Sequence, residues 1–333
     1  MNLVLFSRAI RRAIFAYVLL VVVLCGWCLS SAQLPQNGLS APNNGYTYQL
    51  STGREFSSIA HGPSLIDLDR LTSGLRPGRG VPIPNAADVH TLPVKDVSFY
   101  NGRGELLSGW ISLTSPTAPV IILTHGTPGN RVSMILRAAF LHEHGFNVLL
   151  FDFQSYGKSE GEMSTLGMVE SEDILAAISF LHSLPATKLS KIAVLGLSMG
   201  ATAAVLAASR SQDILALVAE SCPVDATRVT ADVPNEASRQ ADKQLVEEVY
   251  GVDITQARPI DAVNKLAGHT AVFFINGDAD TITPPAGMQA LYSRAGNPKQ
   301  YWIVPGAQHA QSFTIDPEDY IQRVDAFFDW YLG

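Results

Sequence analysis

The chain has 333 residues, of which 47% are hydrophobic and 16% charged, and its formal net charge at pH 7 is −7. This length is enough for one large domain with extensions or for two small domains. The acidic balance, with no Lys/Arg cluster after residue 12, argues against a nucleic-acid-binding protein, which needs a basic surface to contact phosphates.

Residues 1–32 have the pattern of an export segment. Three arginines between positions 8 and 12 precede an unbroken apolar or small-residue run over 13–29, and small residues then lead to a possible cleavage point before Gln33. The run also reaches the lower limit of length for a membrane span. The positive charges before this run place the N-terminus on the cytoplasmic side of the membrane and the rest of the chain on the other side. We expect an extracytoplasmic protein, with residues 1–32 either removed as a signal peptide or retained as a membrane anchor.

Residues 33–93 are rich in Pro, Gly, Asn and Ser, which mark turns and irregular chain. We interpret this stretch as a linker or arm, with one short helix possible over residues 64–71. Two of the three cysteines lie in the apolar N-terminal run, so Cys222 is alone in the exported part. No intramolecular disulfide is therefore expected there.

From residue 94 onwards the pattern becomes regular and predicts one α/β domain over 94–333. Alternating apolar residues around Asn101-Gly102 indicate a hairpin, and short apolar runs then alternate with helix-length amphipathic segments. The runs are Val120–Leu123, Asn147–Phe153, Ile192–Leu197, Ile214–Ala219, Ala271–Ile275 and Tyr301–Val304, and the helices are expected near Val132–Glu143, Leu166–Leu184, Met199–Ser209, Pro285–Arg294 and Pro317–Tyr331. Continuous apolar strands separated by helices are typical of a parallel sheet covered on both faces.

One interval interrupts this alternation. Residues 222–268 hold no strand-like run and contain a polar helix around Glu236–Tyr250. An insertion of this length, placed after a strand, is a candidate lid that shapes a binding site.

The stretch Gly196-Leu197-Ser198-Met199-Gly200 lies where a predicted strand ends and a helix of small residues begins. A nucleophile elbow needs this context, because its serine adopts a strained backbone conformation and the residues two positions away must be small. The pentapeptide alone fits an ordinary strand-to-helix turn equally well. The partners that a nucleophile requires must decide between these interpretations.

A serine nucleophile needs a base and an acid that orients the base. His309, in the loop after the last strand, is the one histidine that follows every plausible acid. Asp280, in the turn after the strand near residues 271–275, is the preferred acid. Its neighbour Asp278 is the main alternative, and Glu220 is a weaker one that could instead cap a helix or form a salt bridge.

Acyl transfer also needs hydrogen-bond donors for the oxyanion. The segment Leu123–Asn130, with sequence LTHGTPGN, follows the first parallel strand. We expect the backbone N–H of Thr127 to act together with that of Met199, the residue after the nucleophile. His125 is interpreted as a structural residue that packs this loop.

Taken together, these motifs resemble those of the α/β-hydrolases, from about residue 94 to the end. Four signatures occur in order: LTHGTPGN, FDFQSYGKSEG, GLSMG and the pair NGDADTITP and PGAQH. The chain is most similar to the exported or membrane-anchored branch related to serine aminopeptidase-like and esterase-like hydrolases. The resemblance implies the α/β-hydrolase fold and a Ser-Asp-His triad, but not a substrate. One departure is Gln154, where relatives usually carry an arginine that serves loop packing.

Two other patterns do not support a different chemistry. The run Tyr156–Ser159 lacks the glycine that a phosphate-binding loop needs five residues before Gly157. His142 and His144 are two apart on a predicted helix and therefore point to different faces, which does not favour a metal site. We expect no metal and no cofactor.

The sequence therefore predicts an exported serine hydrolase that cleaves a small-molecule carboxylic ester through Ser198, Asp280 and His309. An aminopeptidase, amidase or thioesterase with the same triad is the alternative within enzymes. An aminopeptidase would need an acidic group for the substrate ammonium, for which Glu236, Glu247 and Glu248 are available. A non-catalytic binding protein built on this scaffold is the remaining alternative.

Overall fold

The computed structural model describes residues 47–49, 55–57, 82–89, 91–187, 190–228 and 236–333. The predicted export segment and the possible helix over residues 64–71 lie outside these residues. Among the helices that the structure does describe, none is both long and apolar enough to cross a membrane.

The chain divides into two compact units, Met1–Gly62 and Pro63–Gly333. Within the first unit, β1 (Thr47–Gln49) and β2 (Glu55–Ser57) pair antiparallel. This short pair lies in the stretch that the sequence analysis interprets as a linker or arm. All the features below belong to the second unit, where a 3-10 helix, η1 (Ala86–Asp88), precedes the sheet.

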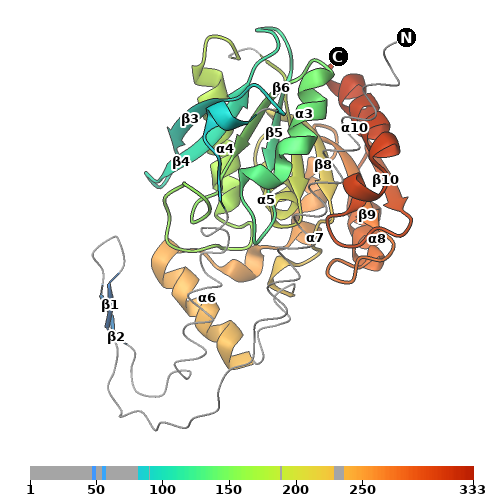
Figure 1. Cartoon of the computed structure of the whole chain (residues 1–333). Helices are drawn as coiled ribbons and strands as arrows, with labels where there is room; N and C mark the ends of the chain where they lie inside the picture. Colours follow the sequence, from blue (N-terminus) through green and yellow to red (C-terminus); the bar gives the residue numbers. More distant parts are fainter. Residues whose placement is uncertain (1–46, 50–54, 58–81, 90, 188–189, 229–235) are drawn as a thin grey trace, which may run out of the picture. The chain divides into compact units, whose positions relative to one another are not determined.

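The second unit contains an eight-stranded, mostly parallel sheet (Figure 1), which confirms the predicted fold. Its strands are β3 (Lys95–Tyr100), β4 (Leu106–Ser112), β5 (Val120–Thr124), β6 (Asn147–Phe151), β7 (Ile192–Leu197), β8 (Ile214–Glu220), β9 (Ala271–Gly277) and β10 (Lys299–Val304). Their order across the sheet is β10-β9-β8-β7-β5-β6-β4-β3. The hairpin β3–β4 is antiparallel, and β4 joins β6 antiparallel, whereas the remaining neighbours are parallel. Strand β7, which ends just before Ser198, is therefore central.

Helices cover both faces of the sheet, which explains the continuous apolar runs. In β5, Val120 and Ile122 belong to one buried cluster, whereas Ile121 and Leu123 belong to the other. The first cluster includes residues of α4 (Glu170–Ser183), α5 (Met199–Ala208) and α8 (Pro285–Arg294), and the second includes residues of α3 (Ile135–Glu143) and α10 (Pro317–Leu332). Both faces of each central strand are thus removed from water.

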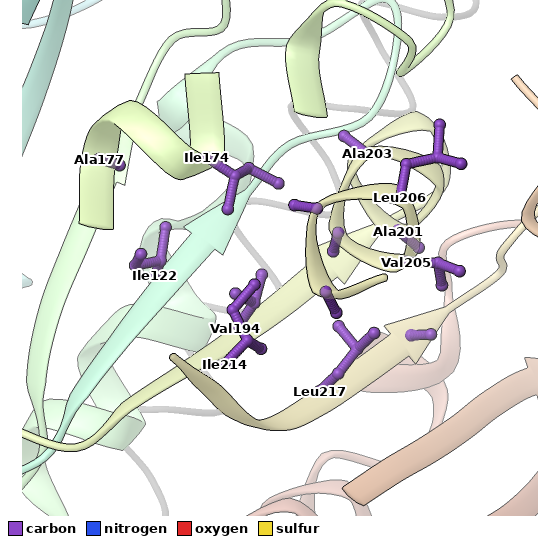
Figure 2. Close-up of a cluster of buried hydrophobic side chains, with 14 of the residues drawn as sticks. Ile122, Ile174, Ala177, Val194, Ala201, Ala203, Val205, Leu206, Ile214 and Leu217 are labelled. Carbon is purple, nitrogen blue, oxygen red and sulfur yellow. The ribbon is translucent and has the colours of Figure 1, made fainter. Parts of the chain in front are cut away.

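Helix α5 begins immediately after the central strand β7 and is buried along its whole length. Figure 2 shows its Ala201 and Val205 beside Val194 of β7 and Leu217 of β8, with Ile174 of α4 nearby. The many small side chains of α5 let the helix lie close to the sheet. The start of the helix is therefore fixed firmly with respect to the strand ends.

Two helices start later than the sequence predicts. The expected helix near Leu166–Leu184 begins only at Glu170, because Leu166 and Gly167 have positive φ values of 56° and 103°. The Glu170 carboxylate accepts hydrogen bonds from the N–H groups of Gly167 and Thr165, each at 2.9 Å. These bonds stabilise a turn where a regular helix was expected. The helix expected near Val132–Glu143 begins at Ile135, and a 3-10 helix, η2 (Arg131–Met134), precedes it.

The predicted insertion contains α6 (Glu236–Tyr250), with the bounds expected from the sequence. Short elements flank it: η3 (Ala226–Arg228), η4 (Ile254–Gln256), α7 (Pro259–Ala262) and η5 (Val263–Leu266). The C-terminal half of α6 packs against the loop before α4, where Val246 and Tyr250 form a buried cluster with Met163 and Val169. One short helix that the sequence analysis does not predict, α9 (Ser312–Ile315), follows the His309 loop.

Candidate active site

Ser198 lies between β7 and α5 in a strained backbone conformation, with φ 53° and ψ −117°. A positive φ is uncommon for a residue other than glycine. The two flanking glycines are required by close packing. A Cβ on Gly196 would lie 2.6 Å from the Gly200 carbonyl oxygen, and a Cβ on Gly200 would overlap the Thr124 carbonyl oxygen. The backbone is therefore that of a nucleophile elbow, not of an ordinary turn.

Three of the predicted site residues form a continuous chain of hydrogen bonds. His309 Nε2 lies 2.9 Å from Ser198 Oγ, and His309 Nδ1 lies 2.9 Å from Asp280 Oδ2. Ser198 and Asp280 are 6% and 3% exposed, whereas the His309 side chain is 18% exposed. With Nδ1 protonated towards the carboxylate, Nε2 is the acceptor for the Ser198 hydroxyl. This arrangement can remove a proton from Ser198.

The Asp280 carboxylate is held by its own turn as well as by His309. Thr283 donates its N–H to Oδ1 at 2.8 Å and its hydroxyl to Oδ2 at 2.7 Å, and the N–H of Ile282 donates to Oδ1 at 3.0 Å. Burial alone raises the pKa of Asp280, but the hydrogen bonds from His309 and Thr283 outweigh it and lower the pKa below its ordinary value. Asp280 is therefore ionised beside the imidazole.

Sequence reasoning did not identify Thr283, although a hydroxyl residue three positions after the acid is a recognisable signal. Such a residue can bond back to the carboxylate through both its N–H and its hydroxyl, as in an Asx-type turn. Its hydroxyl also lies 3.2 Å from His309 Nδ1. Thr283 thus contacts both members of the acid–base pair.

The two alternative acids have other partners. Asp278 accepts a hydrogen bond from the N–H of Gly306 at 2.6 Å, which joins the two loops that follow β9 and β10. Glu220 is fully buried and forms a salt bridge with Arg137 at 2.7 Å, and it also accepts the Tyr320 hydroxyl at 2.8 Å. The structure therefore places Asp280 beside His309 and the other two carboxylates elsewhere.

The predicted oxyanion donors lie on elements that adjoin Ser198. The loop after β5 passes next to the elbow, because a Cβ on Gly126 would lie 3.1 Å from Ser198 Cβ. Thr127 is the next residue in this loop. Met199 is the first residue of α5, and the N–H groups of a first helical turn have no partner within the helix. The partial positive charge of the helix N-terminus adds to the attraction for an oxyanion.

His125 is buried with both ring nitrogens engaged. Nδ1 lies 2.8 Å from the Gly126 carbonyl oxygen, and Nε2 accepts the N–H of Phe153 at 3.2 Å. Burial lowers the pKa of His125, which keeps the ring neutral. The side chain therefore ties the loop after β5 to the loop after β6, as a structural residue would.

The loop after β6 is held by a buried ion pair. Arg131 Nη2 lies 2.7 Å from Asp152 Oδ2, and both side chains are almost fully buried. Within the same loop, Gln154 donates from Nε2 to the Met163 carbonyl oxygen at 2.8 Å. Gln154, where relatives usually carry an arginine, thus packs the loop and has no hydrogen bond to the triad.

A cavity of about 380 Å³ lies beside the turn that carries Asp280; none of the triad residues lines it, but it reaches Thr283, which contacts both Asp280 and His309. It lies between the segment after β8 and the turn that carries Asp280, and its lining residues are 222–225, 282–284, Arg258 and Gly287. Most of the walls are apolar, and Asp225 is paired with Arg258. Among the described residues no group of three or more His, Cys, Asp or Glu side chains could hold a metal ion.

The chain is similar to known proteins over most of this unit. Esterase Pf2001 of Pyrococcus furiosus is 27% identical, with a TM-score of 0.63, and the alignment covers 77% of this chain and all of that one. An uncharacterised protein of Mycobacterium tuberculosis is 29% identical over 252 residues, which is 74% of this chain and 83% of that one. The α/β-hydrolase GrgF of a Penicillium species shares the fold, at 19% identity and a TM-score of 0.60, over 72% of this chain and 99% of its own.

These similarities extend to a defined protein family. Residues 133–333, which contain the elbow, the acid turn and the histidine loop, match the family model of the prolyl oligopeptidases, peptidase family S9. The fold and the esterase relatives agree with a hydrolase. The chain is therefore a member of the prolyl oligopeptidase family and a serine hydrolase of the α/β-hydrolase superfamily.

Proposed function

We propose that the protein hydrolyses carboxylic esters through a Ser198–His309–Asp280 triad. His309 accepts the Ser198 proton as Oγ attacks the substrate carbonyl, and the N–H groups of Thr127 and Met199 stabilise the oxyanion. The protonated imidazole then donates its proton to the leaving alcohol, which leaves an acyl-enzyme. Water, deprotonated by the same imidazole, releases the acid and restores the serine. The hydrogen-bond chain from Asp280 to Ser198 on the strained elbow is the observation that carries this proposal.

The substrate class is proposed from the relatives and from the cavity. The Pyrococcus furiosus relative is an esterase, and esters need less leaving-group assistance than amides. We assign the cavity beside Thr283 as the acyl pocket, because its walls are largely apolar and its volume falls in the range of small-molecule sites. The insertion contributes Asp225 and Arg258 to these walls.

Cleavage of a peptide or amide is the second candidate, and the family match is the observation that favours it. An aminopeptidase needs a carboxylate that is available to the substrate ammonium. Asp225, which lines the cavity, is already paired with Arg258, while Glu247 and Glu248 are exposed on α6. This charge arrangement favours an uncharged acyl group in the pocket.

A fluorophosphonate probe and a matched substrate panel test the proposal. The wild type should be labelled and should hydrolyse p-nitrophenyl esters faster than aminoacyl anilides, whereas Ser198→Ala should lose about 10⁴-fold or more in kcat/KM. Faster cleavage of the anilides would favour the peptidase. Equal labelling of the wild type and Ser198→Ala would instead support a non-catalytic binding protein.

We also propose that the protein acts outside the cytoplasm. The support comes from the sequence of residues 1–32, with its basic start, apolar run and small-residue end. Cleavage before Gln33 would release the enzyme, whereas retention would anchor it through residues 13–29.

A further inference from the structure

The C-terminal end of β8 contacts both the nucleophile and the loop that carries the base. The Glu220 carbonyl oxygen accepts the N–H of Ser198 at 2.9 Å. The next residue, Ser221, accepts the N–H of Ala310 on its side-chain oxygen at 3.2 Å. That N–H belongs to the peptide group that joins His309 to Ala310. Glu220, the last residue of β8, is therefore hydrogen-bonded to Ser198, and Ser221, the residue after it, is hydrogen-bonded to the residue after His309.

Residues 220 and 221 are themselves fixed in position. The N–H of Ser221 donates to the Ile275 carbonyl oxygen at 2.9 Å, which ties it to β9, and its side chain is fully buried. The Glu220 carboxylate is bonded to Arg137 on α3 and Tyr320 on α10. Ser221, which accepts the hydrogen bond from Ala310, is thus held in place by the sheet and by the helices that cover it.

Three residues other than glycine have positive φ values at this place: Ser198 at 53°, Ser221 at 49° and Ala310 at 62°. Such strain persists only where the surrounding contacts fix it, and it concentrates at functional sites. At Ser198 the strain presents the nucleophile. Ser221 has no such part in the proposed reaction, and a glycine would adopt its conformation with less strain. What serine offers there and glycine does not is the hydroxyl that accepts the Ala310 N–H.

We propose that Ser221 is a positioning residue for His309. Its hydroxyl holds the 309–310 peptide group and so keeps the imidazole within 2.9 Å of both Ser198 and Asp280. The His309 side chain lies partly exposed in a surface loop, so its position depends on such backbone contacts. This inference rests on the proposed function, in which His309 is the base.

The test compares Ser221→Gly and Ser221→Ala with the control Ser312→Ala. The control also removes a buried hydroxyl just after the His309 loop, and that hydroxyl has no hydrogen-bond partner among the described residues. For p-nitrophenyl acetate, both Ser221 variants should lose about tenfold in kcat with KM unchanged, because a displaced base slows chemistry without altering the pocket. Fluorophosphonate labelling should slow by a similar factor, while Ser312→Ala should match the wild type.

The glycine variant separates positioning from simple stability. Because glycine relieves the strain at φ 49°, Ser221→Gly should unfold at the same temperature as Ser221→Ala or higher, and yet have the same low kcat. A kcat within twofold of the wild type in either folded variant would overturn the proposal. Full activity in Ser198→Ala would instead refute the triad itself, so the two failures can be told apart.

Discussion

Asp280 combines burial with a set of hydrogen bonds that favour its charged form. Burial raises its pKa, but the bonds from His309 and Thr283 lower it further than burial raises it. An ionised carboxylate at this position holds the imidazole in the tautomer that can accept the Ser198 proton. The same bonds couple the stability of the protein to pH.

This coupling has a defined sign. Because the folded-state pKa of Asp280 is lowered, its contribution to stability is present above the unfolded value of about 3.9 and is lost as the pH falls through the folded value. The free energy of unfolding of the wild type should therefore fall more steeply than that of Asp280→Asn below about pH 4. Urea denaturation at several pH values measures both slopes. Parallel slopes for the two proteins would contradict the prediction.

The identities of Ser198, Asp280 and His309 could be predicted because chain order and turn context restrict the choice. The distinction between Asp280 and Asp278 is geometric, since only the former is directed at His309. For Glu220, a salt bridge was one of the two roles expected if it was not the acid, and the structure shows one with Arg137, but its partners could not be predicted. Its partners lie 83 and 100 residues away on two helices, and nothing local in the sequence reports such a contact.

At the scale of elements, Tyr250 forms hydrogen bonds that join α6 to the body of the unit. Its hydroxyl accepts the N–H groups of Glu162 and Met163 at 2.9 and 3.1 Å, and Arg103 donates to its carbonyl oxygen at 2.9 Å. The sequence predicted the bounds of this helix from its polarity and length. It could not predict the docking, because the partners of Tyr250 lie in loops 87 to 147 residues away in the sequence.

Removal of that hydroxyl should weaken the attachment of α6. Tyr250→Phe should lower the free energy of unfolding by about 1–3 kcal/mol, because the Glu162 and Met163 N–H groups lose a buried acceptor. Tyr100→Phe, at a residue 68% exposed, is the control and should have no effect. Chemical denaturation of both variants measures the difference. Indistinguishable midpoints would show that the bonds of Tyr250 contribute nothing.

Helix α8 limits the proposed acyl pocket through Gly287, where a Cβ would lie 2.6 Å from Val224 Cγ2. Gly287→Val should reduce kcat/KM for p-nitrophenyl octanoate more than for the acetate, because the added side chain occupies space needed by the longer chain. Gly102→Ala is a control, since a Cβ there meets nothing within 4 Å. An unchanged octanoate-to-acetate ratio would remove the cavity as the acyl pocket.

At the scale of the whole molecule, the parallel sheet was predictable because its central strands are apolar on both faces. The order of its strands was not predictable, because the sequence of an apolar run such as β5 or β8 does not indicate which strand it pairs with. The hairpin β3–β4 was predictable from its turn, but its junction with β6 depends on tertiary pairing. Local pattern thus indicates the elements, and packing decides their arrangement.

The proposed export can be tested directly on the protein. If residues 1–32 are a cleaved signal, N-terminal sequencing of the extracytoplasmic protein should begin at Gln33. A retained anchor should instead leave the intact chain in the membrane fraction. Recovery of the full-length chain from the soluble cytoplasm would contradict both forms of the proposal.

The backbone contacts around the elbow also determine what can be redesigned. The Ser198 side chain is the replaceable part, since a cysteine at this position would change the reactivity and leave the strand–helix junction intact. The positions two residues away on either side cannot accept even a methyl group without moving neighbouring carbonyl groups. A redesign of the nucleophile in this scaffold therefore has to keep the glycines at positions 196 and 200.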